Sequence, residues 1–197
     1  TNMSVSELWY PSIIVHHNSP QGIQHMNDCL HTRLYNHLLP HYESQEHSSF
    51  CGVASATIVL NATSVSDSTD TTGSSKRKYS QSYLFKYVIQ ARHDTKMLNG
   101  MTLEQLCLVL NRCGMKTILR SGNETTAERF ELQFRSDLDK YLASDQNTVY
   151  IICNFWRKFL ARTEKEEYVH SGGHFSPLGC YDKQSDKVLV LETSAKR

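Results

Sequence analysis

One stretch decides the fold: residues 45–61 read QEHSSFCGVASATIVLN. Its first five residues are polar, and behind Cys51 the residues suited to a buried face recur at helical spacing. These residues are Val53, Ala56, Thr57 and Leu60. We therefore predict a helix that begins at Cys51. A thiol in that place faces the positive end of the helix dipole, which favours the thiolate and makes Cys51 a candidate nucleophile.

Gln45 and His174 supply two further groups that a cysteine nucleophile needs. Gln45 lies six positions before Cys51, a distance over which a short loop can turn its amide toward an oxyanion forming beside the sulfur. His174 follows Gly172 and Gly173, and two glycines leave room for another backbone or a ligand to approach closely. We assign Gln45 as the oxyanion donor and His174 as the base.

A predicted hairpin brings a carboxylate to His174. Residues 175–181 and 187–192 read as two strands around a polar turn. If the turn is centred near Lys183, His174 lies opposite Glu192; if it is centred on Gln184, the two are diagonal neighbours on one face. In either register the carboxylate can hold the imidazole tautomer and stabilise its charged form. The set predicts acyl transfer through a thioester on Cys51.

The same motifs and several others follow one another in a fixed order. They occupy residues 18–22, 45–55, 59–61, 100–103, 134–138, 154–157, 173–177 and 188–192. Over about residues 13 to 192, this order resembles the catalytic domain of phytochelatin synthases. The resemblance implies a papain-like fold with a Cys-His-Asp triad. In that triad Cys51 is the nucleophile, His174 the base, and Glu192 the occupant of the aspartate position, while Gln45 supports the oxyanion.

The resemblance to this family also implies the reaction that we expect of the chain. Its members remove glycine from glutathione, keep the γ-glutamyl-cysteinyl group as a thioester, and pass it to a second glutathione or to water. Arg157 and Asn154 match a family position near the substrate, where an arginine can pair a carboxylate and an amide can hold the peptide. Gly173 is expected to present its backbone beside the scissile carbonyl. No required cofactor and no protein-bound metal is expected, and heavy-metal ions enter as thiolate complexes of glutathione.

The chain departs from the family pattern in three places. Glu192 replaces the aspartate, Ala195 stands where a basic residue is usual, and His47 occupies a loop position where some relatives are acidic or polar. The chain also ends five residues after Glu192, without the cysteine-rich region of plant relatives, and a truncated domain is left open. We therefore expect hydrolysis to dominate over polymer synthesis.

Length and composition favour one catalytic domain of the α+β class, with a helical N-terminal half and an antiparallel sheet in the C-terminal half. The 197 residues carry a formal charge of +1, which gives no electrostatic argument for nucleic acid. No apolar run suits a membrane span and no secretory signal is visible. The expected location is cytoplasmic, because glutathione and reduced cysteines coexist there, with export by an unseen route left open. A polar insertion is predicted at about 62–82. A homodimer is left open.

Two other functions fit the sequence. The same triad could serve a cysteine protease or deamidase that acts on a protein substrate, with His47 and the polar insertion in a remodelled cleft. The chain could also be an inactive binding module, because a lone cysteine at a helix start is more often a small core residue. The six cysteines show no disulfide-module or zinc-finger spacing, and we expect them to be reduced thiols.

Overall fold

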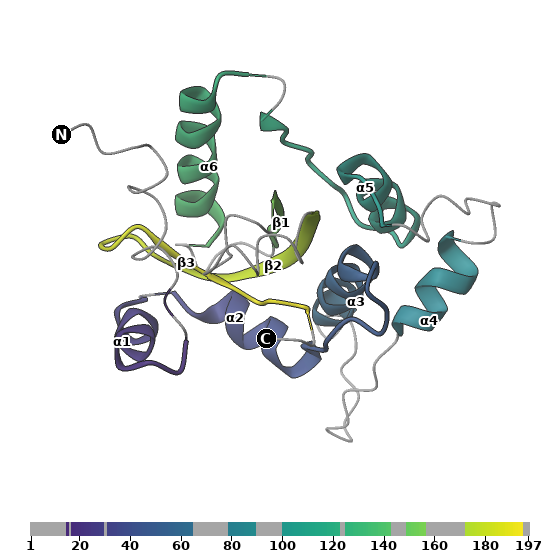
Figure 1. Cartoon of the computed structure of the whole chain (residues 1–197), viewed down its shortest axis with the longest axis horizontal. Coiled ribbons are helices and arrows are strands. Elements are labelled where there is room, and N and C mark those ends of the chain that lie inside the picture. Colours follow the sequence, from purple (N-terminus) through teal and green to yellow (C-terminus); the bar gives the residue numbers. More distant parts are fainter. Residues whose placement is uncertain are drawn as a thin grey trace.

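The computed structural model describes residue 15 and residues 17–29, 31–64, 79–89, 100–122, 125–142, 149–156 and 172–194. Helices make up the N-terminal part of the described chain, and three antiparallel strands follow (Figure 1). This arrangement confirms the α+β class and the division into a helical and a sheet-forming half. Within these ranges, every helix is too short or too polar to cross a bilayer.

The elements follow one another in a simple order. The helical elements are α1 (Pro20–Asp28), α2 (Arg33–Leu38), the 3₁₀ turn η1 (Leu39–His41), α3 (Cys51–Ser64), α4 (Gln81–Tyr83), the π-helical turn η3 (Leu84–Ile89), α5 (Leu103–Arg112) and α6 (Ala127–Tyr141). The strands are β1 (Ile152–Trp156), β2 (Gly173–Asp182) and β3 (Lys187–Val190). The sheet has the order β1-β2-β3, so β2 is its central strand.

Hydroxyl side chains cap the start of four described helices, α4 among them through Ser80. Ser19 accepts a hydrogen bond from the backbone N–H of Gly22 and caps α1, and Thr126 caps α6 in the same manner. Thr102 and Gln105 form the reciprocal capping box at the start of α5. Each cap satisfies an N–H group that has no acceptor inside its own helix, so the sequence fixes these boundaries locally.

α3 is buried along its length, from Cys51 to Ala62. One side of it, through Val53 and Leu60, packs into a core shared with α5 and η3, and another side, through Ile58, packs against Leu38 and Leu191. A helix that is apolar on several faces is stable only when neighbours cover it. The burial of α3 therefore gives its N-terminus a fixed place.

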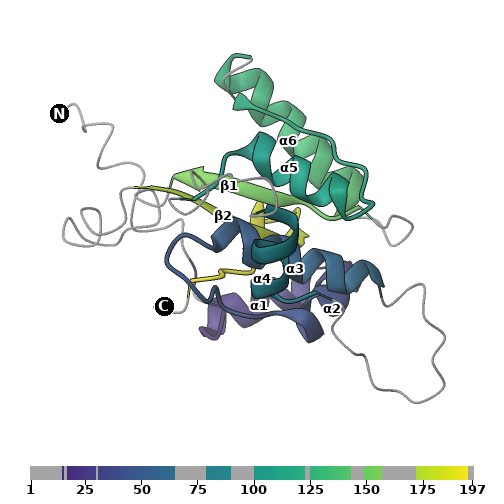
Figure 2. The same ribbon diagram turned by 90° about the vertical axis from the view of Figure 1, so that its right-hand side faces the viewer.

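β2 is buried from His174 to Asp182 because helices cover the sheet on both sides. Figure 1 shows α6 on one side of the sheet and α1 and α2 on the other, and Figure 2 shows the same layers from a second direction. On the α6 side, Leu138 packs with Leu178 and Tyr181. The end of β2 that carries His174 lies against α3, which positions the candidate site.

The apolar run at residues 148–155 favours a buried strand. The strand observed there is β1, which begins at Ile152 and is only half-buried, because it forms an edge of the sheet. Of the polar insertion predicted at 62–82, residues 65–78 lie outside the described residues. Residues 62–64 complete α3, and Gln81 near the other end is 1% exposed and bonds to Glu46 and Ser44.

Candidate active site

Cys51 and His174 meet where α3 packs on β2. Cys51 opens α3, His174 is the second residue of β2, and their side chains hydrogen-bond to each other. Cys51 is 8% exposed and His174 is 1% exposed. The predicted nucleophile and base are therefore in contact at a site that largely excludes water.

Glu192 lies on the other side of the imidazole. Its Oε1 is 2.5 Å from Nε2 of His174, and the same oxygen accepts a hydrogen bond from the backbone N–H of Ser194 at 2.8 Å. Because the carboxylate engages Nε2, the ring nitrogen left for the sulfur is Nδ1. The three side chains therefore follow one another in the predicted order, with the imidazole between the thiol and the carboxylate.

The hairpin register explains how a glutamate reaches this place. Leu178 pairs with Val190 on β3, which corresponds to a turn centred on Gln184 and makes His174 and Glu192 diagonal neighbours. An irregularity in the register between Leu178 and Tyr181 separates this pair from the pairing nearer the turn. The longer side chain of glutamate spans the diagonal distance. The second of the two predicted registers is the observed one.

Backbone contacts tie the loop before Cys51 to the segment that carries Glu192. The hydroxyl of Tyr42 donates to the carbonyl of Glu192 at 2.5 Å, and the N–H of Gln45 donates to the carbonyl of Thr193 at 2.7 Å. The hydroxyl of Thr193 in turn donates to the carbonyl of Phe175 at 3.2 Å. These bonds fix the carboxylate, the imidazole strand and the cysteine loop as one unit.

The surroundings of Cys51 favour the thiolate. Burial raises the pKa of the thiol, but hydrogen bonds from His174 and from the backbone N–H groups of Phe175 and Gly52, together with the charge of His174, outweigh burial and hold this pKa below its ordinary value. N–H groups at the start of a helix have no acceptor inside the helix, so Gly52 is free to serve the sulfur. Phe175 does so from the strand.

His174 shows the matching change. Burial lowers the pKa of the imidazole, whereas the hydrogen bonds and negative charges of Cys51 and Glu192 raise it, and the net direction is upward. The ring of Phe155 packs edge-on against the imidazole, with centroids 5.5 Å apart. A lowered thiol pKa beside a raised imidazole pKa favours a thiolate–imidazolium pair, the reactive form of a cysteine nucleophile.

The side chain of Gln45 bonds to its own loop, and its role as oxyanion donor stays a prediction. Its Nε2 donates to the carbonyls of His47 and Ser48, at 2.8 and 2.9 Å, which uses both of its N–H bonds. Its Oε1 is buried without a partner. The side chain braces its own loop, and sequence reasoning missed this because the competing acceptors are local carbonyls. The N–H of Cys51 lies in the first turn of α3 and has no acceptor inside the helix, which makes it a second candidate for the oxyanion donor.

A close approach of Met101 explains the glycine after the nucleophile. A Cβ atom added to Gly52 would lie 2.5 Å from Sδ of Met101 and 3.3 Å from the ring of Phe175. Met101 follows Gly100, whose φ of +108° is costly for any other residue. Gly52 and Gly100 together let the segment before α5 cover the base of the site.

The predicted substrate contacts lie beside His174 at the surface. In the β1–β2 pairing, Asn154 is opposite Phe175 and Trp156 is opposite Gly173, on either side of the Phe155–His174 pair. Asn154 and Gly173 are exposed, and a Cβ on Gly173 would lie 3.1 Å from Oδ1 of Asn154. Arg157 and Ala195 lie outside the described residues, so their roles remain predictions.

Several functional contacts were invisible in the sequence. The backbone N–H of Phe175 and the hydroxyl of Tyr42 act through tertiary contacts that no residue pattern encodes. Only the glycines around Cys51 and His174 hinted at backbone crowding there. Within the described residues, no group of three or more His, Cys, Asp or Glu side chains is arranged to hold a metal ion.

Comparison with known proteins adds a family context. The family model described as phytochelatin synthase matches residues 5–196. The glutathione gamma-glutamylcysteinyltransferase of Schizosaccharomyces pombe is 26% identical over 153 residues, covering 77% of this chain and 32% of that protein. Glutathione gamma-glutamylcysteinyltransferase 2 of Arabidopsis thaliana is 24% identical over 159 residues, covering 80% and 31%.

A third relative gives the same proportions. Glutathione gamma-glutamylcysteinyltransferase 1 of Triticum aestivum is 26% identical over 157 residues, which is 80% of this chain and 28% of that protein. The chain thus matches about a third of the length of these curated relatives. The range matched by the family model, residues 5–196, includes Cys51, His174 and Glu192.

Proposed function

Because the chain belongs to the phytochelatin synthase family, we propose that it cleaves glutathione through a γ-glutamyl-cysteinyl thioester on Cys51. The observation that carries this proposal is the contact of Cys51, His174 and Glu192 in one buried unit. An inactive binding module has no need of a thiol whose pKa is lowered by an imidazole. A cytoplasmic location fits the proposal, since glutathione and reduced thiols coexist there.

The first half-reaction removes glycine. The thiolate of Cys51 attacks the cysteinyl carbonyl of glutathione, and the negative charge that develops on oxygen lies near the start of α3, where the N–H groups and the helix dipole favour it. His174 gives its Nδ1 proton to the departing amine of glycine, while Glu192 holds Nε2 and keeps the ring in place. The C–N bond breaks and a thioester remains on Cys51.

The second half-reaction releases the acyl group. Neutral His174 takes a proton from water, or from the amine of a second thiol peptide, and the attack of that group on the thioester returns the thiolate of Cys51. We favour water as the acceptor, because His47 changes the loop before the nucleophile where a second substrate would enter. Heavy-metal ions take part only as thiolate complexes of glutathione, that is, as substrate.

The exposed strand end beside His174 is where glutathione fits. Asn154 is exposed one residue from the Phe155–His174 pair and can hold the peptide amide, and the backbone of Gly173 is open beside it. We propose that Arg157 pairs with a carboxylate of the substrate. A short peptide can thus lie across the ends of β1 and β2, with its cysteinyl carbonyl at Cys51.

A product assay with purified protein tests the proposal. Glutathione is incubated with and without cadmium, and glycine, γ-Glu-Cys and the two-unit γ-Glu-Cys peptide are measured by mass spectrometry. We expect glycine and γ-Glu-Cys in equal amounts, and little of the longer peptide. Cys51→Ser is expected to abolish release, while Cys153→Ser, at a half-buried cysteine outside the site, keeps it. Absence of glycine, or equal release by Cys51→Ser, contradicts the proposal.

A further inference from the structure

A second cysteine pair lies toward the other end of β2. Cys29 is the C-cap of α1, and its Sγ is 3.0 Å from Sγ of Cys180 in β2. Cys29 is 8% exposed and Cys180 is 1% exposed, and all six cysteines of the chain are unbridged. The triad uses neither residue. Two thiols in contact, from elements about 150 positions apart, are the geometry from which a disulfide forms.

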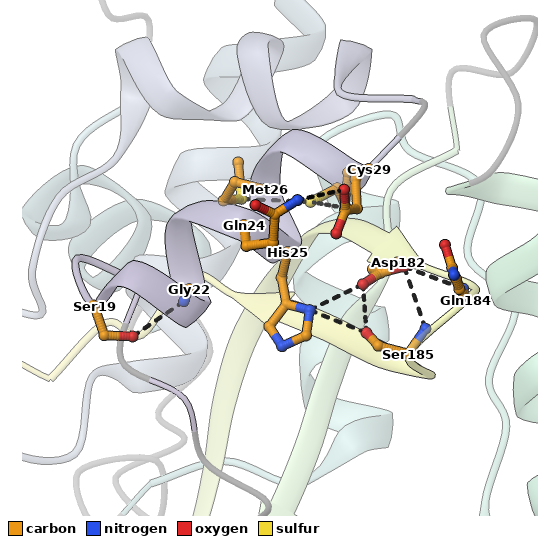
Figure 3. A network of polar contacts seen from close by, with 11 residues as sticks. Ser19, Gly22, Gln24, His25, Met26, Cys29, Asp182, Gln184 and Ser185 are labelled. Carbon is orange, nitrogen blue, oxygen red and sulfur yellow. Dashed lines mark hydrogen bonds and ion pairs between the residues drawn. The ribbon is translucent and has the colours of Figure 1, made fainter.

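A polar clamp holds the two elements together beside the sulfurs. Nδ1 of His25 on α1 is 3.0 Å from Oδ2 of Asp182 and 3.1 Å from Oγ of Ser185. The other oxygen of Asp182 accepts backbone N–H bonds from Gln184 and Ser185, so the carboxylate is fixed at the hairpin. Figure 3 shows His25 pointing from α1 to Asp182 and Ser185, with Met26 and Cys29 on the same helix.

The clamp and the two sulfurs lie at the same contact between α1 and β2. His25 and Cys29 are four positions apart, so they share one face of the helix, and Cys180 and Asp182 are two apart on the strand. Sδ of Met26 lies 3.8 Å from Sγ of Cys180 and fills the remaining side. A disulfide requires the sulfurs to move about 1 Å closer, a shift that side-chain rotation can supply.

The two thiols are not equivalent. The hydrogen bond between the two thiols lowers the pKa of Cys29, and this effect outweighs burial and the charges of Asp182 and Asp28. The same contact and burial raise the pKa of Cys180. Cys29 is thus the sulfur that ionises more readily and is also the more exposed of the two.

We propose that Cys29 and Cys180 form a reversible disulfide when a small peroxide reaches them. The thiolate of Cys29 attacks one oxygen of hydrogen peroxide, which gives the sulfenic acid on Cys29 and releases hydroxide. The sulfur of Cys180 then attacks the sulfenic sulfur, the S–O bond breaks, and its proton leaves with the hydroxyl group as water. In total two thiols and one peroxide give one disulfide and two waters, and a dithiol reductant reverses the change.

The bond would fix α1 to the strand that also carries His174. It closes a loop of about 150 residues, and restricting the unfolded chain by that length is expected to raise the midpoint of thermal unfolding by about 10 °C. The proposal does not depend on glutathione chemistry, because it involves only α1 and the far part of β2.

The test uses the full chain in a Cys51→Ser background, so that the nucleophile does not consume the oxidant. After treatment with hydrogen peroxide, remaining thiols are alkylated in denaturant, the protein is digested, and linked peptides are identified by mass spectrometry. We expect a peptide pair joining Cys29 to Cys180, two hydrogen atoms lighter than the reduced pair, together with the rise in the unfolding midpoint. Both changes should reverse with dithiothreitol.

Two variants separate this site from general thiol oxidation. In Cys180→Ser the sulfenic acid should persist on Cys29, where a dimedone probe traps it, and the unfolding midpoint should not rise with peroxide. In Cys107→Ser, which changes a half-buried thiol of α5, the linked pair should form as before. The proposal is overturned if Cys29 and Cys180 are both alkylated as free thiols after peroxide, or if Cys29 is linked to another cysteine instead.

Discussion

The two parts of β2 each hold a buried sulfur site, and the two sites differ in the partner that the sulfur meets. Near its start, His174 contacts Cys51, and near its end Cys180 contacts Cys29. An imidazole can carry the proton that the thiol loses and give it to a leaving group, whereas a second thiol can only share that proton or form a bond to sulfur. We infer that the group bonded to each sulfur, and not the burial of the sulfur, determines whether the site suits acyl transfer or disulfide formation.

Cys153 is a further cysteine whose pKa can be compared with that of Cys51. It lies in β1, and burial raises the pKa of its thiol to about 12. Cys51 exposes less of its surface than the half-buried Cys153, yet its pKa falls, because an imidazole and two backbone N–H groups act on the sulfur. The pKa values of Cys51 and Cys153, which lie in and against the same sheet, therefore differ because their hydrogen-bond partners differ.

Removing the sulfur of Cys51 has the largest expected effect and breaks only one of the two sites. In Cys51→Ala, glycine release from glutathione should fall by a factor on the order of 10³ or more, because the proposed thioester forms on the sulfur that the variant lacks. The matched variant Cys29→Ala should keep glycine release and lose the peroxide-induced disulfide. Loss of glycine release in Cys29→Ala without loss of folding would contradict the separation of the two sites.

Replacing Glu192 by glutamine should have the next largest effect. The variant keeps a hydrogen-bond acceptor for Nε2 but removes the charge, so we expect kcat to fall roughly 10- to 100-fold. Glu192 raises the pKa of His174, so without its charge the imidazolium loses its proton at lower pH. The alkaline limb of the pH–rate profile should therefore move to lower pH. An unchanged limb would mean that Glu192 does not act on His174.

Adding a methyl group at Gly52 tests how tightly the base of the site is packed. Gly52→Ala should lower the free energy of unfolding by about 1–3 kcal/mol, because the new Cβ meets Met101. The double variant with Met101→Ala should recover part of this loss relative to Met101→Ala alone. Urea unfolding followed by circular dichroism measures both. Purely additive losses would show that Met101 does not crowd Gly52.

The smallest expected effect concerns the link between the cysteine loop and Glu192. Tyr42→Phe removes the hydroxyl that donates to the carbonyl of Glu192, and the free energy of unfolding should fall by about 0.5–1.5 kcal/mol. A modest loss of kcat should accompany it if the bond also positions the carboxylate. A stability equal to that of the parent protein would show that water replaces the hydroxyl at no cost.

Local patterns predicted the parts of the fold that local physics determines. The helix that begins at Cys51 and the β2–β3 hairpin follow from hydrophobic spacing and turn residues, and both are present. The contact of Cys51 with His174 was predicted because a cysteine nucleophile needs a base, and the two glycines before His174 mark that histidine as the candidate. The hairpin register was left open between two alternatives, because a shift in the turn changes which residues lie opposite one another.

Tertiary choices were harder to predict. Gln45 was assigned to the oxyanion, but in the folded loop its amide donates to two nearby carbonyls. The sequence does not show which acceptors lie within reach of the amide. β1 was predicted to be buried because its residues are apolar, and its place at the sheet edge exposes Asn154 and Trp156. The contact of Cys29 with Cys180 arises from the docking of α1 on β2, which no spacing along the chain records.

The most direct test of the account measures the rate at which iodoacetamide modifies Cys51 and Cys153 as a function of pH, with mass spectrometry of each peptide. If Cys51 is a thiolate held by His174, its alkylation begins below the pH at which an ordinary thiol reacts, and Cys153 stays unmodified at neutral pH. In His174→Ala the onset for Cys51 should move to higher pH. An onset for Cys51 at or above that of an ordinary thiol, unchanged by His174→Ala, would contradict the account.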